Sequence, residues 1–297
     1  MRRRIRLLLG GGLLLLGASA QGADQVTYTV KFAPSGDATL DSLLRQTSSL
    51  VSLRGKLPPA PFTLIGRARA DGQQFLIVLH SLGYDAGAVN ITINGKPLDD
   101  PTLADALTQA PASQTATVLI TPQKGAQFRL GRVDVTGLPS GFTPPPMVKP
   151  GDTALAAPVI AAGPALRTAL HNAGYAFAKV SAPLAVAEPA THVLNVTYTV
   201  TCGPRVDIGA ISFAGLKRTD PDFLRRHIAL RPGERYSDTT LQAARDSLLG
   251  LGVFASVTPV PQDHPSPDGQ VPISFRVVEQ KRHAVTLSGV YATDTGF

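Results

Sequence analysis

The chain has 297 residues, a formal net charge of +7 and a single cysteine, Cys202. Four of the basic residues lie within the first six positions, so the net charge of the remainder is only about +3. With no tryptophan and so small an excess of positive charge, the composition argues against a nucleic-acid-binding protein.

The first 20 residues have the pattern of a secretory signal peptide. Arginines at positions 2, 3, 4 and 6 precede an apolar run, 7–17, which is followed by the small residues Ala18-Ser19-Ala20. The apolar run is shorter than the roughly 20 residues of a membrane-spanning helix, which makes a retained anchor the less favoured alternative. We expect cleavage between Ala20 and Gln21 and export of the remainder.

Residues 25–123 are predicted to form the first of three similar units. The expected order is a strand over 26–32, helices over 40–53 and 62–82, and strands over 89–93 and 115–121. Prolines at 58, 59 and 61 separate the two helices. Asn94-Gly95 predicts a tight turn after the second strand, and Asp99-Asp100-Pro101 is expected to cap a short helix around 103–107.

Residues 126–202 are predicted to form the second unit. A strand over 128–135 is followed by helical pieces between 152 and 173, which Gly163-Pro164 is expected to interrupt. Strands over 175–186 and 192–201 complete the unit.

Residues 204–281 are predicted to form the third unit. After a strand over 206–213, a helix is expected from Thr219 with Pro221 just inside its start. Ser237 or Asp238 is expected to cap a second helix. Strands over 253–257 and 271–278 follow, separated by a proline-rich turn, 259–267.

Two glycine patterns support this division. The segment from Gly125 to Leu138 has the same glycine spacing as the segment from Gly203 to Leu216, 78 residues further on. In addition, a helical stretch ends at a glycine and is followed by a strand at Gly83, Gly174 and Gly252. A fixed period indicates a small module that is used more than once.

Residues 283–297 belong to none of the three units. Apolar side chains alternate there with small or polar ones, which is the pattern of one strand of a transmembrane β-barrel. A disordered segment or an ordinary edge strand at a terminus fits the same alternation equally well.

The segments 203–215, 250–257 and 289–296 together resemble the polypeptide-transport-associated (POTRA) domains and first barrel strand of the BamA/TamA superfamily of outer-membrane assembly proteins. Three units behind a signal peptide are most similar to the TamA-like branch. The resemblance implies an α+β fold of tandem β-α-α-β-β domains, each with a three-stranded mixed sheet and two helices on one face. The start of a truncated barrel, 283–297, would follow.

The resemblance also implies a function. The chain would be the periplasmic arm of a factor that assembles and translocates outer-membrane proteins or autotransporters, located at the periplasmic face of the outer membrane. Its partners would be a TamB-like periplasmic or inner-membrane subunit, unfolded clients, and the membrane itself through a barrel absent from this chain. Alternatives are another superfamily member, either BamA-like or a two-partner-secretion transporter, and a stand-alone periplasmic binding module.

In the family's sheet the third strand lies between the other two, so the second strand of each unit would have an unpaired edge. Such an edge can bind an incoming strand by β-augmentation, in which the two main chains pair. Neighbouring units or side chains could instead cover it. The candidate edge residues are Val89, Asn90, Ile91, Thr92, Ile93, Tyr175, Ala176, Phe177, Val253, Phe254, Ala255, Ser256 and Val257.

Catalysis is the rival class of function, and the sequence offers little for it. There is no GxSxG or HExxH motif, and the six histidines lack the spacing of zinc ligands. Cys202 is expected to be a buried, inert side chain rather than a thiol that pairs with a partner. We therefore expect no catalytic residues, no metal and no cofactor.

Overall fold

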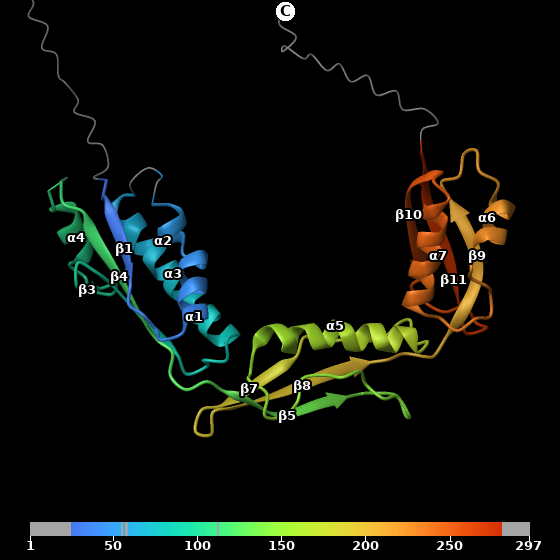
Figure 1. The fold of residues 1–297 in the computed structure, drawn as a ribbon, viewed down its shortest axis with the longest axis horizontal. Coiled ribbons are helices and arrows are strands. Elements are labelled where there is room, and N and C mark those ends of the chain that lie inside the picture. Colours follow the sequence, from blue (N-terminus) through green and yellow to red (C-terminus); the bar gives the residue numbers. More distant parts are fainter. Residues whose placement is uncertain (1–24, 55, 57–58, 112, 281–297) are drawn as a thin grey trace, which may run out of the picture. The chain divides into compact units, whose positions relative to one another are not determined.

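The computed structural model describes residues 25–280, apart from 55, 57, 58 and 112. The predicted signal peptide, its cleavage site at Ala20 and Gln21, and the predicted barrel strand lie outside these residues. The described strands form three mixed sheets, each built from a separate stretch of the chain (Figure 1). The chain divides into two compact units, one within 1–80 and 86–126 and the other within 81–85 and 127–297. None of the helices described is long and apolar enough to span a membrane.

The first unit contains one four-stranded sheet. Its elements are β1 (Tyr28–Phe32), α1 (Ala38–Thr47), α2 (Ser49–Ser52), α3 (Pro61–Ser81), β2 (Ala88–Ile93), β3 (Lys96–Pro97), α4 (Leu103–Thr108) and β4 (Ala116–Gln123). The strand order is β1-β4-β2-β3, with β4 parallel to β1 and antiparallel to β2. Asn94 and Gly95 make the predicted turn, because both have the positive φ, 52° and 82°, that a tight hairpin requires.

The helix predicted over 40–53 is divided at Ser48. The Ser48 hydroxyl accepts a hydrogen bond from Val51 N at 3.2 Å and so starts α2 as a new helix. Asp71 of α3, only 2% exposed, accepts hydrogen bonds from Ser48 Oγ (2.6 Å), Ser49 N (2.8 Å) and Leu50 N (3.1 Å). This buried carboxylate ties the start of α2 to the long helix.

The second sheet comprises β5 (Arg129–Thr136), β6 (Lys179–Val180), β7 (Leu184–Glu188) and β8 (Val193–Thr201), with α5 (Ala156–Asn172) along one face (Figure 1). Central β8 is parallel to β5 and antiparallel to β6 and β7. The expected interruption at Gly163-Pro164 was wrong, because α5 is continuous. Pro164 is exposed, so its ring and the carbonyl that it leaves unbonded can face water, whereas Leu166 and Leu170 are buried.

The third sheet has the order β10-β11-β9. Its elements are β9 (Asp207–Ala214), α6 (Pro221–His227), α7 (Asp238–Gly250), β10 (Phe254–Pro261) and β11 (Gln270–Glu279). Pro221 begins α6 and the Ser237 side chain caps α7, as predicted. The proline-rich turn begins later than expected, because Pro259 and Pro261 belong to β10.

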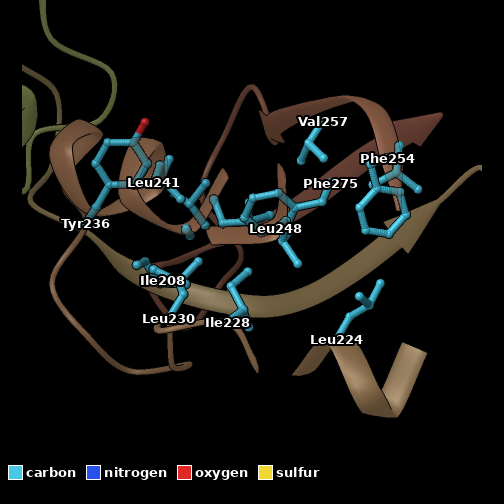
Figure 2. Packing of buried hydrophobic residues seen from close by; sticks show 14 of the residues in the cluster. Ile208, Leu224, Ile228, Leu230, Tyr236, Leu241, Leu248, Phe254, Val257 and Phe275 are labelled. Carbon is cyan, nitrogen blue, oxygen red and sulfur yellow. The ribbon is translucent and has the colours of Figure 1, made fainter. Parts of the chain in front are cut away.

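Apolar side chains from α6, α7 and the sheet form the core of this third segment (Figure 2). Leu248 of α7 and Phe275 of β11 lie in the middle of the cluster, with Tyr236 at one end and Phe254 at the other (Figure 2). All four side chains are at most 4% exposed. Helix α7 therefore buries its apolar face against the sheet, as the periodicity of its sequence requires.

The repeated glycines mark the same structural position in two sheets. Gly137 follows β5 and Gly215 follows β9, with φ values of 79° and 94°. A Cβ atom at Gly137 would collide with the Val200 carbonyl oxygen, and one at Gly215 with that of Val277. The first strand of each sheet thus ends where the backbone presses against the central strand, which explains why glycine recurs there.

The third strand of each segment, β4, β8 or β11, lies between the other two, as the resemblance implied. The prediction of an α+β fold made of tandem domains is confirmed. The expectation of three strands in every sheet was wrong, because β3 extends the first sheet and β6 and β7 divide one edge of the second. Two helices were also expected beside the second sheet, where residues 126–202 form the single helix α5. The sequence-predicted edges can therefore be examined one by one.

Candidate strand-binding edges

The first edge is that of β2, and all of Val89 to Ile93 lie in this strand. In an antiparallel pair, residues that hydrogen-bond to the partner strand alternate with residues that direct N–H and C=O the other way. The bond from Asn94 N to Thr117 O, 2.9 Å, continues the register of β2 with β4. The backbone N–H and C=O groups of Val89, Ile91 and Ile93 therefore point away from β4. Because β3 pairs with Thr92 and Ile93, the outward groups of Val89 and Ile91 form the exposed part of this edge.

A groove of about 530 Å³ runs beside these two residues, between β2 and α3. Leu76 and Gly72 of α3 line one side, and the other side includes Ile91, Pro97 and Leu98. Arg69 donates a hydrogen bond from Nη2 to the Leu98 carbonyl at 2.8 Å. An extended segment placed along β2 would find peptide groups at the edge and an apolar surface beside them.

The second edge lies later in the sequence than predicted. Tyr175, Ala176 and Phe177 precede the sheet, in a turn that a 3.0 Å hydrogen bond from Ala178 N to Tyr175 O closes, so their expected position in an edge strand was wrong. Ala176 and Phe177 pack against the core cluster of the third sheet instead. The apolar sequence could not distinguish this turn from a strand, because apolar side chains of the turn also pack against a core.

The edge strand of the second sheet is formed by β6 and β7, interrupted at 181–183. A groove of about 400 Å³ lies between β6 and α5, lined by Ile160, Pro164, Arg167 and Val180 among others. On β7, Leu184 and Val186 are 65% and 53% exposed. This edge strand therefore exposes two large apolar side chains.

The third edge is that of β10, which begins at Phe254, one residue after Val253. The side chains of Phe254 and Val257 are buried in the core, whereas Ala255 and Ser256 are exposed. A groove of about 380 Å³ separates β10 from α7, and Arg245 lies in it. The Arg245 Nε donates a hydrogen bond to the Val257 carbonyl at 3.1 Å.

The second and third sheets are connected by a polar joint that sequence patterns did not reveal. We define the α5–α7 joint as His171, Asn172, Tyr236, Ser237 and Asp238. The Asn172 Oδ1 accepts hydrogen bonds from Thr239 N (3.1 Å) and Ser237 Oγ (3.0 Å), so the end of α5 helps to cap the start of α7. Nearby, Val206 N donates to the Gly174 carbonyl at 2.8 Å.

His171 is the titratable centre of this joint. Its Nδ1 lies 2.8 Å from Asp238 Oδ2 and its Nε2 lies 3.0 Å from the Ala178 carbonyl oxygen. Because both neighbours are acceptors, the protonated imidazolium can donate to each. The hydrogen bond with Asp238 raises the pKa of His171 despite its partial burial, and the same bond lowers the pKa of Asp238. Tyr236 donates to Asp238 Oδ1 at 3.0 Å.

At the end of the third sheet, Glu279 organises the loop after β9. Its Oε1 accepts hydrogen bonds from the backbone N of Lys217, Arg218 and Thr219, at 3.1, 3.0 and 2.9 Å. Its Oε2 pairs with Arg218 Nε at 3.1 Å. These donors, led by the Arg218 amide, hold the pKa of Glu279 well below its usual range.

The described residues contain no group of three or more histidine, cysteine or acidic side chains placed to hold a metal ion. The Cys202 thiol is partly buried and donates weakly to the Gly137 carbonyl at 3.4 Å. Burial raises its pKa, which disfavours the reactive thiolate.

Comparisons with known proteins add to this geometry. Residues 206–280 match the POTRA family, described as a surface antigen variable number repeat. Over 188 residues the chain is 25% identical to the outer membrane protein assembly factor BamA of Neisseria meningitidis serogroup B, covering 61% of this chain and 23% of that protein. The corresponding factor of Neorickettsia risticii is 28% identical over 104 residues, covering 35% of this chain and 14% of the relative.

Among solved structures, POTRA3-5 of Haemophilus influenzae BamA is similar, with a TM-score of 0.49 and 18% identity over 89% of this chain and 100% of that one. The chain spans less than a quarter of the length of the two curated relatives.

Proposed function

This chain is a POTRA region of the BamA/TamA superfamily, and from that premise we propose that it is the periplasmic arm of an outer-membrane protein assembly and translocation factor. The curated relatives bear the name of an outer membrane protein assembly factor. The observation that carries the proposal is an exposed sheet edge beside an apolar groove, present at β2 and again at β6 and β7. Proteins normally avoid such edges unless they use them.

At β2, an incoming extended segment would form main-chain hydrogen bonds with Val89 and Ile91. Alternate side chains of that segment would enter the groove between β2 and α3, against Leu76 and Leu98. Main-chain pairing tolerates many sequences, and an apolar groove favours segments in which every second residue is apolar. Strands of outer-membrane barrels have this alternation, so they suit the site as clients.

We assign the three sheets to three domains, 25–123, 126–202 and 204–281. On this count of domains the chain is TamA-like, with a TamB-like subunit as its partner, rather than BamA-like or a two-partner-secretion transporter. Saturable binding of a purified TamB-like subunit to the exported chain would support the assignment, and absence of binding would favour the other branches. Mass spectrometry of the secreted chain, with Gln21 as its first residue, would test the proposed cleavage after Ala20.

Strand binding is tested by a glycine-to-leucine pair in α3. Gly72 lines the groove and a Cβ there would lie 3.5 Å from Ile91 Cδ1, whereas a Cβ at Gly66 has no atom within 4 Å. Gly72→Leu would therefore fill the groove, and Gly66→Leu is the matched control for the change in helix propensity.

The probe is a peptide of alternating valine and threonine, with amide hydrogen exchange followed at Val89 and Ile91. The unaltered chain and Gly66→Leu should both gain protection on peptide addition. Gly72→Leu should bind at least about tenfold more weakly, the equivalent of losing one or two apolar contacts. Equal protection in Gly72→Leu and Gly66→Leu would reject the groove as the site. If no edge of the unaltered chain gained protection, strand binding itself would be rejected.

A further inference from the structure

The same helix position lines the groove in all three sheets. Leu76 of α3, Arg167 of α5 and Arg245 of α7 each lie seven residues before the glycine that follows their helix, Gly83, Gly174 or Gly252. Each lines the groove beside its edge strand. The repeat therefore places a leucine at the first edge and an arginine at the second and third, in corresponding positions.

The backbone of β10 differs from that of β2 in the groups it exposes. The hydrogen bond from Gln262 N to Pro272 O, 3.1 Å, continues the register of β10 with β11. By the same alternation, the outward-pointing backbone groups of β10 are those of Val257, Pro259 and Pro261. Proline has no N–H, so two of these three outward positions have no donor to offer an incoming strand.

At the remaining outward position, Val257, the carbonyl oxygen already accepts a hydrogen bond from Arg245. Its Nε donates to the Val257 carbonyl at 3.1 Å, and its guanidinium lies in the groove that a client side chain would occupy. Nη1 of the same side chain pairs with Asp246 Oδ1 at 3.0 Å, which helps to hold the guanidinium in place. An incoming strand would have to displace this charge-assisted hydrogen bond before it could pair with Val257.

We propose that Arg245, Pro259 and Pro261 close the third edge, and that the residue at this helix position decides between the first edge and the third as the place where a strand is accepted. Leu76 has no donor and leaves the first edge open. Clients are thereby directed to the first edge and kept from pairing with β10. This inference rests on the proposed strand binding, which it deepens by naming the residue that selects the edge.

The test exchanges the residues between the two edges in the exported chain. Leu76→Arg gives the first groove the side chain of the third, and Leu76→Gln is the control that is polar but shorter. Arg245→Leu, alone and with Pro259→Thr and Pro261→Thr, opens the third edge. The alternating valine–threonine peptide is the probe, and amide exchange is read separately at β2 and at β10.

In the unaltered chain, we expect protection at Val89 and Ile91 and none at Val257. Leu76→Arg should weaken binding at β2 by about tenfold or more, since one edge carbonyl is then occupied, while Leu76→Gln should retain most of it. The triple variant should gain protection at β10. Protection of β10 in the unaltered chain, or undiminished binding in Leu76→Arg, would overturn the inference.

Self-association gives a readout that does not depend on client binding, because an open edge pairs with another copy of itself. In sedimentation velocity the triple variant should associate, whereas the unaltered chain and Arg225→Leu, an arginine substitution on α6 away from the edge, should not. Unchanged amide exchange in α7 would show that the variant folds. If the peptide protected no edge, the proposed function would fail, but association of the triple variant would still support closure. A folded triple variant that gained neither protection nor association would overturn it.

Discussion

Replacing Asp71 by alanine should unfold the first unit selectively. The buried carboxylate accepts three hydrogen bonds, from Ser48 Oγ, Ser49 N and Leu50 N, and the two amides belong to the first turn of α2. Each buried donor left without a partner costs about 1–3 kcal/mol. The Ser48 hydroxyl can rotate toward another acceptor and Ser49 is only partly buried, so we expect a loss of about 3–5 kcal/mol in the free energy of unfolding. The total free energy of unfolding of a small domain is about 5–15 kcal/mol.

The chain has no tryptophan, so amide hydrogen exchange is the appropriate assay. In Asp71→Ala, amides of α3 should exchange about a hundredfold faster or more, the rate equivalent of the expected loss. Amides of β8 in the second unit serve as the internal control and should not change. Asp37→Ala, which removes a partly buried helix cap that accepts hydrogen bonds from Thr39 N and Leu40 N, should cost only about 1 kcal/mol. Less than tenfold acceleration in α3, or equal acceleration in β8, would refute the reasoning.

Three further predictions concern the second and third sheets. The pKa of His171 is raised above 6.5, so its contribution to stability is complete below pH 6.5 and is lost as the pH rises through the raised value. The pKa of Asp238 is lowered below 3.8, so its contribution is present above pH 3.8 and is lost as the pH falls through the lowered value. In urea denaturation followed by circular dichroism, the unaltered chain should therefore have a higher free energy of unfolding than His171→Gln. The difference should be largest between pH 3.8 and pH 6.5 and should shrink in alkaline buffer. A difference that did not change with pH would contradict a charged pair. Gly137→Ala should destabilise the second sheet by more than about 2 kcal/mol, because a left-handed backbone conformation is combined there with a steric clash. The control is Gly141→Ala, which has the same sign of φ but open space around the new Cβ and should cost less. Equal losses in the free energy of unfolding would refute the clash. Glu279→Gln should speed amide exchange at 217–219, and unchanged exchange there would contradict the role of the carboxylate.

Local patterns predicted most of the elements because their causes are local. The Asn94-Gly95 turn, Pro221 at the start of α6 and the Ser237 cap depend on a few neighbouring residues, and each is where the sequence indicated. The break expected at Pro164 was wrong for a tertiary reason. Packing of Leu166 and Leu170 keeps α5 continuous, and Pro164 lies on the exposed face where its missing hydrogen bond costs least.

The candidate site was only partly predictable. Alternation predicted the strand from Val89 to Ile93, and the family resemblance implied its edge position, but Tyr175, Ala176 and Phe177 are in a turn that packs toward the next sheet. The sequence contained a signal for the proposed edge-selecting position, namely the constant seven-residue spacing from Leu76 to Gly83 and from Arg245 to Gly252. Its role could be inferred only from the hydrogen bond between Arg245 and the Val257 carbonyl, because sequence spacing does not predict that contact.

The sequence by itself determined the repeat and predicted a signal peptide, because these features depend on composition and on periodicity along the chain. The central place of the third strand was implied by the family resemblance. Only the tertiary structure decided which peptide groups face outward, which of them Arg245 covers, and how His171 meets Asp238. Hydrogen-bond register and contacts between distant segments depend on how the chain packs in space. They could therefore be identified only from the structure, in which α7 lies beside β10.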